Sequence, residues 1–194
     1  MKAVPASRYI LFFSIAAGGC AADLLTKHWV FAWLGMPGGQ TWWLWQEVVG
    51  FQTSLNEGAL FGIGQGMVPV FAALSFAAAL AILWWLFYAG AAREWLLTAA
   101  LACVMAGIAG NLYDRLGLPG LLWNYANSLH QHGEPVHAVR DWILVMIGTW
   151  PWPTFNIADS LLVCGAGLLV WQAFCAKPEA RQEPAGSAKP QPGH

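Results

Sequence analysis

Four long apolar stretches, separated by more polar segments, dominate the hydrophobic pattern of the chain. Each stretch approaches the roughly 20 apolar residues that a helix needs to cross the hydrocarbon of a bilayer. They run from about Tyr9 to Leu34, Val68 to Ala89, Trp95 to Tyr113, and Asn156 to Cys175. The pattern therefore predicts a mainly α-helical protein built on a bundle of four transmembrane helices.

The two long connections, about Gly35 to Met67 and Arg115 to Phe155, show a different pattern. The first mixes β-branched and aromatic residues with glycines, which is typical of short strands bounded by turns. In the second, the run Trp142 to Trp152 is as apolar as the helices, but it is too short to span and two prolines interrupt it. We expect a small, partly β extracytoplasmic cradle and an interfacial or re-entrant segment.

Composition supports a membrane protein. The 194 residues are 58% hydrophobic and 10% charged, against about 25% charged residues in an average soluble domain. A net charge of -1 offers no basic surface for nucleic acid. We expect a single membrane-embedded domain over residues 1–176. Residues 177–194, rich in Pro, Ala, Glu and Lys, predict a disordered cytoplasmic tail.

The basic residues predict the orientation. They gather at the N-terminus, in the short connection between the second and third stretches, and in the tail: Lys2, Arg8, Arg93, Lys177, Arg181 and Lys189. Because cytoplasmic segments of membrane proteins are enriched in Lys and Arg, both termini are expected in the cytoplasm and both long connections outside a cytoplasmic (inner) membrane. Tryptophans are expected at the outer interface (Trp42, Trp43, Trp45, Trp150, Trp152) and the inner one (Trp84, Trp85, Trp95, Trp171).

The N-terminus has a second interpretation. Lys2 and Arg8, followed by an apolar stretch ending in Ala17-Gly18-Gly19-Cys20, also fit a bacterial lipoprotein signal. The apolar run continues past Cys20 to Leu34, as a transmembrane helix would, and we favour the helix. Detection of an intact Met1 on the mature protein would decide between the two.

Four of the ten acidic residues lie in or beside the apolar stretches: Asp23, Asp114, Asp141 and Asp159. A charge within a bilayer costs roughly 2.5 kcal/mol or more, which makes each such acid a functional hypothesis by default. Asp23 and Lys27 are four residues apart, so they share a helix face and can pair. The pair either neutralises itself and locks helix packing or helps to bind a polar part of a substrate.

Polar residues also mark the ends of two stretches. The sequence Gly110-Asn111-Leu112-Tyr113-Asp114-Arg115 ends the third, with Asn111 and Asp114 on one face and Arg115 able to reach headgroups or a carboxylate. We favour structural support of a site as the role of Asp114 and Arg115. Asn156 opens the fourth stretch as a candidate N-cap and places Asp159 in the first turn.

Asp141 and Asp159 can form an acid/base pair. They are 18 residues apart, and both ends of the intervening segment return to the outer surface, so the topology permits their contact. Two carboxylates held close in a partly desolvated site cannot both ionise easily, and one keeps its proton. The ionised acid can then take a proton from water while the protonated acid donates to a carbonyl oxygen and then to the leaving group.

The remaining polar motifs are weaker. In Asn56-Glu57-Gly58-Ala59-Leu60-Phe61-Gly62, Asn56 can orient a substrate backbone and Gly58 allows close approach, although a mere turn fits equally well. The histidines His130, His132 and His137 match no metal-ligand spacing, and no cofactor motif is present, so we expect neither metal nor cofactor. Three cysteines fall in predicted helices and predict no disulfide: Cys103, Cys164 and Cys175.

Five blocks, taken in order, resemble the signal peptidase II family of bacterial inner-membrane aspartic proteases: Asp23 to Lys27, Asn56 to Gly62, Gly110 to Arg115, Asp141, and Phe155 to Asp159. Together they cover most of the membrane core. The resemblance implies four transmembrane helices, an outer cradle, and Asp141 and Asp159 as the catalytic pair acting with water and no metal. It implies supporting roles for Asp23, Lys27, Asn56, Asn111, Asp114, Arg115, Asn156 and Ala158.

By this resemblance, the chain is expected to be an endopeptidase that removes the signal peptide of prolipoproteins just before a diacylglyceryl-modified cysteine. Its expected partners are those precursors and membrane lipids, and we expect a monomer. Two alternatives stay open. A small transporter or proton-relay protein would spread its polar residues through the membrane depth, and a lipid-binding or assembly protein would tolerate the loss of either acid.

The chain departs from the family pattern in two places. The segment between Arg115 and Asp141 is longer than in familiar members, which suggests a lid or a lineage-specific loop. Arg140 stands where small or apolar residues are usual. A guanidinium facing the site would lower the pKa of Asp141 and favour an ionised role for it, whereas one facing headgroups would not.

Overall fold

The fold is known from a computed structural model that describes residues 3–59, 63–126 and 128–175. Its helices are α1 (Ala6–Leu34), α2 (Val68–Leu83), α3 (Trp95–Arg115) and α4 (Ile157–Cys175), with a π-helical turn, η2 (Trp84–Tyr88), continuing α2. All four, with η2 counted as part of the second, are long and apolar enough to span a membrane. The predicted four-helix bundle is confirmed.

Several expectations fall on residues outside these ranges: the tail 177–194, the basic residues Lys2, Lys177, Arg181 and Lys189, and Leu60, Phe61 and Gly62 of the first connection. Within the described part, α1 runs without interruption through Cys20 to Leu34, as expected for a spanning helix. Cys20 and the other three cysteines are free thiols.

Prolines and glycines set the limits of the helices. Pro5 precedes α1, and Gly35, with a φ of 79°, ends it. Pro69 lies in the first turn of α2, where its missing N–H removes no helical hydrogen bond. After η2, Gly90 adopts a φ of 81° and starts the tight turn, with the 3₁₀ helix η3 (Ala91–Arg93), that leads into α3.

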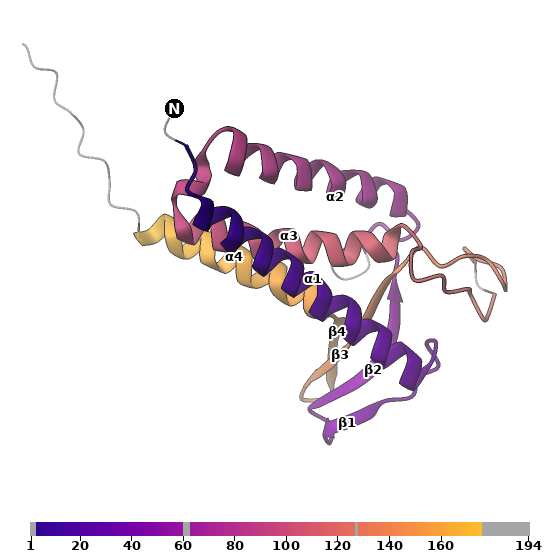
Figure 1. Ribbon diagram of the computed structural model, residues 1–194. Helices are drawn as coiled ribbons and strands as arrows, with labels where there is room; N and C mark the ends of the chain where they lie inside the picture. Colours follow the sequence, from indigo (N-terminus) through magenta and orange to yellow (C-terminus); the bar gives the residue numbers. More distant parts are fainter. Residues whose placement is uncertain (1–2, 60–62, 127, 176–194) are drawn as a thin grey trace, which may run out of the picture.

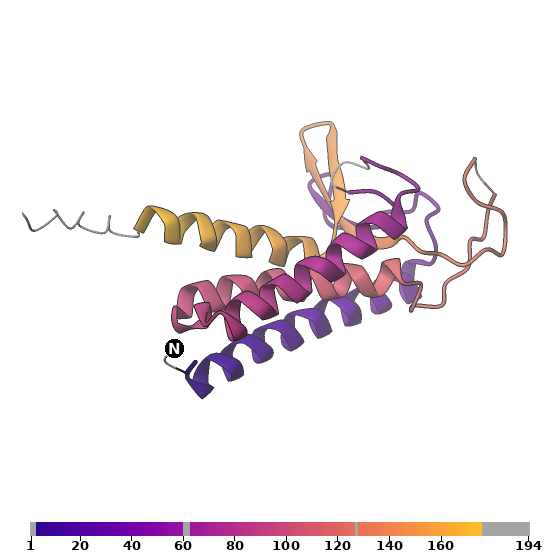
Figure 2. The same ribbon diagram turned by 90° about the horizontal axis from the view of Figure 1, so that it is seen from above.

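Helix α3 is the centre of the bundle and contacts the other three helices (Figures 1 and 2). Glycines allow it to approach α4 closely. A Cβ at Gly107 would lie 2.5 Å from the carbonyl oxygen of Ala158, and one at Gly165 would lie 2.7 Å from that of Ala100. Small residues at such contacts let the two backbones pack together, as is common between transmembrane helices.

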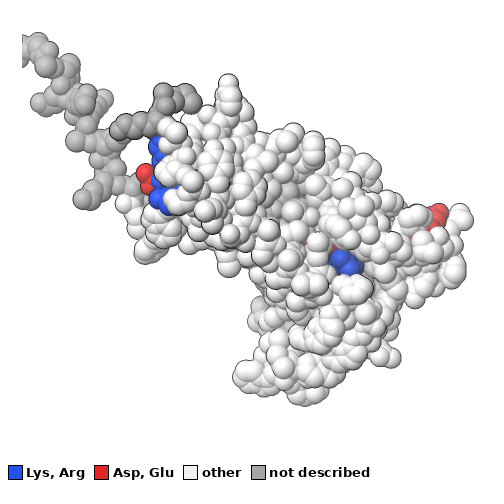
Figure 3. Space-filling model, in the orientation of Figure 1, with Lys and Arg blue, Asp and Glu red and all other residues white. Residues whose placement is uncertain are grey.

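The outward faces of the helices are apolar. Figure 3 shows one face of the molecule with a group of charged atoms beside the N-terminal region, a basic and an acidic patch toward the opposite side, and an uncharged stretch between them. Large apolar side chains are exposed on every helix, among them Leu25, Phe76, Trp95 and Val163. This arrangement fits a protein whose middle is surrounded by lipid.

The two long connections meet in one antiparallel sheet at one end of the bundle, opposite the N-terminus and the end of α4 (Figure 1). Its strands are β1 (Trp42–Trp45), β2 (Val49–Asn56), β3 (Val139–Ile147) and β4 (Trp150–Phe155), in that spatial order. The strands expected in the first connection are present.

The apolar run 142–152 does fold back, but as a β-hairpin that pairs with β2, whereas strands were expected only in the first connection. Gly148, with a φ of 63°, lies in the turn between β3 and β4. Pro151 and Pro153 are accommodated because β4 is an edge strand, whose outward N–H groups need no partner within the sheet.

Two apolar clusters anchor the sheet. Val30 and Phe31 at the end of α1 pack with Trp142 of β3, and Phe51 of β2 meets the Trp142 ring edge to face. The segment 116–138 folds back so that its buried Trp123, together with Val136 and Ala138, packs against Leu55 of β2. These contacts hold the strands at a fixed position over the helix ends, where the polar residues gather.

Candidate active site

A cavity of about 540 Å³ opens between the sheet and the ends of α3 and α4. This volume is within the range of roughly 300 to 1,000 Å³ that is usual for ligand pockets. One wall is apolar, with Trp152, Phe155, Leu162 and Val163. The polar residues that line the cavity are Ser54, Asn56, Gln65, Asn111, Arg115, Asp141, Thr154 and Asp159.

The two carboxylates of the predicted acid/base pair lie on this cavity and come from different elements. Asp141 is on β3, paired in register with Ser54 of β2. Asp159 is in the first turn of α4, three residues after Asn156. Asn156 accepts a hydrogen bond from the backbone N–H of Asp159 (2.9 Å), and its own backbone N–H donates to the Asp159 carboxylate (3.2 Å). This reciprocal cap fixes the start of the helix and the carboxylate together.

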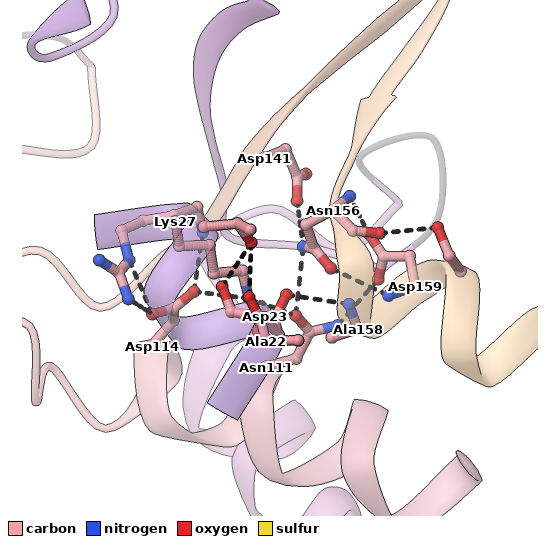
Figure 4. Close-up of polar contacts among 12 residues, drawn as sticks. Ala22, Asp23, Lys27, Asn111, Asp114, Asp141, Asn156, Ala158 and Asp159 are labelled. Carbon is pink, nitrogen blue, oxygen red and sulfur yellow. Dashed lines mark hydrogen bonds and ion pairs between the residues drawn. The ribbon is translucent and has the colours of Figure 1, made fainter. Parts of the chain in front are cut away.

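Asn156 also reaches the other acid. Its Nδ2 donates to Oδ1 of Asp141 over 2.6 Å, so one asparagine contacts both carboxylates (Figure 4). Nδ2 of Asn111, on α3, donates to Oδ1 of Asp159 over 2.8 Å. Oδ1 of Asn111 accepts from Nδ2 of Asn156 (3.2 Å). The two acids are therefore held by side-chain amides, which supply hydrogen bonds and no charge.

Burial changes the acidity of Asp141. The residue is only 1% exposed. Loss of solvation, followed by the charge of Asp159, raises its pKa from an ordinary value of 3.8 to about 8, against the opposing effects of Lys27 and of hydrogen bonds from Asn156 and Asn56. Asp141 is therefore protonated at neutral pH.

The guanidinium of Arg140 does not face Asp141. It binds the carboxylate of Asp114 instead. Its Nε and Nη2 donate to Oδ1 of Asp114 over 2.9 and 2.8 Å, and its backbone N–H donates to Oδ2. Neighbours along a strand point to opposite faces, which separates this guanidinium from the carboxylate of Asp141. The condition for a lowered pKa at Asp141, a guanidinium facing the site, is therefore not met, and the pKa of Asp141 is raised.

Behind the cavity lies a buried ion cluster of Asp23, Lys27, Asp114 and Arg140. Nζ of Lys27 is 2.7 Å from Asp23 and 3.0 Å from Asp114, and these three side chains are 0% exposed. With two acids and two bases, the cluster has no net charge. Figure 4 shows three of its members, Asp23, Lys27 and Asp114, near Asn111 and Asn156.

The ion cluster joins three helices and does not line the cavity. Oδ1 of Asp23 accepts a hydrogen bond from the backbone N–H of Ala158 over 2.9 Å, which ties α1 to the first turn of α4. Gly110 makes room for this contact, since a Cβ there would overlap the Asp23 carboxylate. Asp23, Lys27, Asp114 and Ala158 thus lie behind the cavity wall.

Arg115 and the turn 56–59 form the rim of the cavity. Nη2 of Arg115 donates to the carbonyl oxygen of Gly58 over 3.1 Å. Oδ1 of Asn56 accepts from the backbone N–H of Gly58 (3.0 Å), and Nδ2 donates to the carbonyl of Ala59 (3.3 Å). Asn56 therefore shapes a turn, as one of its two interpretations held, and also lines the cavity.

Several lining residues were not predicted. Ser54 had a usable signal, because it precedes Asn56 by two positions in a predicted strand and so shares its face. Gln65 lies among the glycines of the first connection, and Thr154 of β4 follows Pro153, so neither had a signal that pointed to a site. The apolar lining residues Leu162 and Val163 have no distinguishing signal, since they look the same in the sequence as lipid-facing residues.

The histidines of the segment 116–138 make protein contacts. Nε2 of His130 is 2.5 Å from Oε1 of Glu57, and Nδ1 of His137 is 3.2 Å from the carbonyl oxygen of Arg115. In the described part of the chain, no group of three or more His, Cys, Asp or Glu residues is arranged to hold a metal ion.

Comparison with known proteins identifies the family. The family model described as signal peptidase (SPase) II matches residues 15–175. This chain belongs to the signal peptidase II family. The lipoprotein signal peptidase of Rhodopirellula baltica is 47% identical over 193 residues, which cover 97% of this chain and 82% of that protein. The lipoprotein signal peptidase of Rhodococcus jostii is 30% identical over 173 residues, 84% and 72% of the two chains.

The fold is shared with solved structures. A bacterial membrane enzyme determined by the in meso method at 2.3 Å resolution matches with a TM-score of 0.67 at 24% identity, covering 89% of this chain and 94% of that one. A second structure of this description, at 1.9 Å, gives 0.65 at 24% identity over 86% and 94%. Membership in the signal peptidase II family and the four spanning helices make this chain a multi-pass membrane peptidase.

Proposed function

We propose that the chain is an aspartyl endopeptidase that cleaves the signal peptide from prolipoproteins just before the diacylglyceryl-modified cysteine, with Asp141 and Asp159 as its catalytic pair. The observation that carries this proposal is the pair of carboxylates on one cavity, both bonded to Asn156. The relatives named lipoprotein signal peptidases support the substrate.

The surroundings of the two acids support different roles for them. Asp141, with a pKa of about 8, holds a proton and donates it to the carbonyl oxygen of the scissile bond. Asp159 accepts N–H hydrogen bonds from Asn111 and from the start of α4, which hold its carboxylate at the cavity, and it takes a proton from water.

The hydroxyl of that water adds to the carbonyl carbon. The proton held by Asp159 then passes to the leaving nitrogen as the C–N bond breaks, and the tetrahedral centre returns a proton to Asp141 as the carboxyl product forms. Since the acids share one site, their titration belongs to the pair.

The rim binds the peptide on either side of the scissile bond. Nε of Arg115 is buried and makes no hydrogen bond with the described residues, so it is available to a substrate carbonyl. Asn56 and Asn111 line the same cavity. The apolar wall of Leu162 and Val163 belongs to a spanning helix, and the lipid chains of the substrate lie along it in the bilayer.

The placement in the cell follows from the bundle. The sheet formed by the two long connections lies at one end of the bundle, opposite the N-terminus (Figure 1), and Nε of Arg8, in α1, donates to the carbonyl oxygen of Arg93, in η3. The positive-inside rule then places the termini in the cytoplasm and the cavity at the outer face of the inner membrane. The chain acts as a monomer with one peptidase domain over residues 1–176.

Cleavage of a synthetic lipid-modified precursor by the purified protein in detergent tests the proposal. The wild type is expected to release the signal peptide, and the same precursor without lipid is expected to stay intact. Glu94→Gln, an exposed acid outside the cavity, is the matched control for Asp141→Asn and Asp159→Asn. Full activity in either aspartate variant would contradict the assignment.

A further inference from the structure

Glu57 stands between two residues of the cavity rim but does not line the cavity itself. Asn56 and Gly58 face the cavity. Glu57 is 6% exposed, so its carboxylate is largely withdrawn from water. A buried carboxylate needs a partner, and Nε2 of His130, 73 residues away in the sequence, lies 2.5 Å from its Oε1. The turn of the rim is thereby linked to the long segment 116–138.

His130 is held in place by its own segment. Its ring stacks on Trp123 with centroids 4.5 Å apart and planes 8° apart, and Trp123 is 3% exposed. The backbone of Trp123 bonds to Glu134 and Gly133. Nδ1 of His130 lies 3.4 Å from Oε2 of Glu134.

The two carboxylates around His130 also indicate how it binds. Glu57 and Glu134 face opposite nitrogens of the ring. Ionised carboxylates only accept hydrogen bonds, so a ring nitrogen of His130 that carries a proton can donate to the carboxylate that it faces. Tyr125, packed edge to face on Trp123, is the other titratable group nearby, and burial together with the charge of Glu57 raises its pKa.

The turn 56–59 is consequently held from two sides. Arg115, at the end of α3, binds the carbonyl oxygen of Gly58. His130 binds the side chain of Glu57 from the outer side, where the segment 116–138 projects beyond the bundle (Figure 1). Because Asn56, Gly58 and Ala59 line the cavity, the position of this turn sets the width of its opening.

We propose that His130 and Glu57 are positioning residues for substrate binding, through which the segment 116–138 clamps the turn 56–59 against the cavity. The inference rests on the proposed function, since it takes the cavity as the peptide site. Neither residue touches the reacting atoms. Their pair fixes Asn56 and the backbone of Gly58 where the precursor binds. Asn56 also hydrogen-bonds Asp141, but Asp141 keeps its bond from Asn156, and Asp159 is held by Asn111 and the start of α4, all outside the turn 56–59.

Kinetics on the lipid-modified precursor test the clamp. His130→Ala is expected to raise KM by about tenfold, the worth of one hydrogen bond to a charged group, with kcat within about twofold of the wild type. Glu57→Ala is expected to do the same, and the double variant to be no worse than either single one. His132→Ala, exposed on the same segment, is the matched control and keeps the wild-type KM.

Conservative variants separate positioning from simple folding. Glu57→Gln keeps an oxygen that accepts from His130, and His130→Gln keeps a donor, so both are expected to recover most of the wild-type KM. An unchanged KM in His130→Ala would overturn the clamp, as would a fall in kcat at constant KM. If the wild type does not cleave the precursor at all, the proposed function fails instead, so the two failures are distinguishable.

Discussion

The two pairs of buried or half-buried acids differ in what accompanies them. Asp23 and Asp114 face the cations Lys27 and Arg140 in the ion cluster. Asp141 and Asp159 face the amides of Asn156 and Asn111 on the cavity. A nearby cation favours the ionised form of a carboxylate and so makes it a poor proton donor. An amide orients the carboxylate without adding a charge, so burial can raise its pKa, as at Asp141. The side chains that contact each carboxylate, cations in one case and amides in the other, therefore separate the acids of the ion cluster from the acids proposed to be catalytic.

Asn111 connects the two regions. Its Oδ1 accepts from Nζ of Lys27 over 3.0 Å, and an ammonium can only donate. The amide is therefore oriented with its nitrogen toward Asp159, to which it donates. Lys27 thus fixes the direction of the hydrogen bond that Asn111 donates to Asp159, the proposed general base.

The largest expected effect comes from removing a carboxylate on the cavity. Asp141→Asn and Asp159→Asn are each expected to lower kcat by about 10³-fold, the usual scale of general acid or base catalysis, because the proton transfers are lost. The protein should stay folded, since the amide can still meet its neighbours. Single-turnover cleavage and thermal unfolding in detergent measure the two effects, and a parallel loss of folded protein would contradict this contrast.

Removing a carboxylate from the ion cluster is expected to act on stability instead. Asp114→Asn leaves Lys27 and Arg140 buried with one acid between them, which should cost about 3–5 kcal/mol of unfolding free energy. The thermal midpoint in detergent reports this cost. Surviving folded enzyme should keep kcat within tenfold of the wild type, and a stable but inactive protein would place Asp114 in the chemistry.

Substitutions of Asn111, which connects the ion cluster to Asp159, are expected to have an intermediate effect on kcat. Asn111→Leu removes the hydrogen bond to Asp159 and is expected to lower kcat by about tenfold or somewhat more, since bonds to charged groups contribute roughly 1.5 to 3 kcal/mol. Asn111→Asp tests the orientation argument, because its oxygens cannot donate to Asp159. It should be no more active than the leucine variant, and wild-type activity in it would refute the argument.

The pH dependence of kcat tests whether Asp141, unlike the acids of the ion cluster, acts as a proton donor. Asp141 must be protonated to act as the acid, so kcat is expected to fall about tenfold per pH unit above a pKa of about 8. A pH profile of single-turnover rates checks this limb, and a rate that kept rising to pH 10 would exclude the role.

The same raised pKa affects folding. Between 3.8 and about 8, Asp141 is protonated in the folded chain and ionised in the unfolded one, so the free energy of unfolding decreases as pH rises through that window. Asp141→Asn should therefore gain stability over the wild type as pH rises, which thermal unfolding at pH 5 and pH 8 can measure.

The sequence predicts features that depend on length and local spacing. The helices follow from the lengths of the apolar runs, and the pairing of Asp23 with Lys27 follows from their spacing of four. The cap formed by Asn156 and Asp159 is likewise local. These features need no knowledge of which elements become neighbours.

Features that depend on packing could not be predicted. The pairing of Arg140 with Asp114 spans 26 residues and exists only because β3 lies over the end of α3. The hairpin of β3 and β4 was not expected because prolines argue against a strand, and whether a strand lies at an edge is a property of the whole sheet. The raised pKa of Asp141 depends on burial, which spacing does not report.

The prolines of β4 have a further consequence. An exposed sheet edge normally offers a row of N–H donors on which a passing extended chain can add as another strand. Pro151 and Pro153 have no backbone N–H, so two of the six residues of the edge strand β4 cannot donate a hydrogen bond. The β4 edge therefore offers fewer positions for the addition of a further strand than an edge strand without proline would.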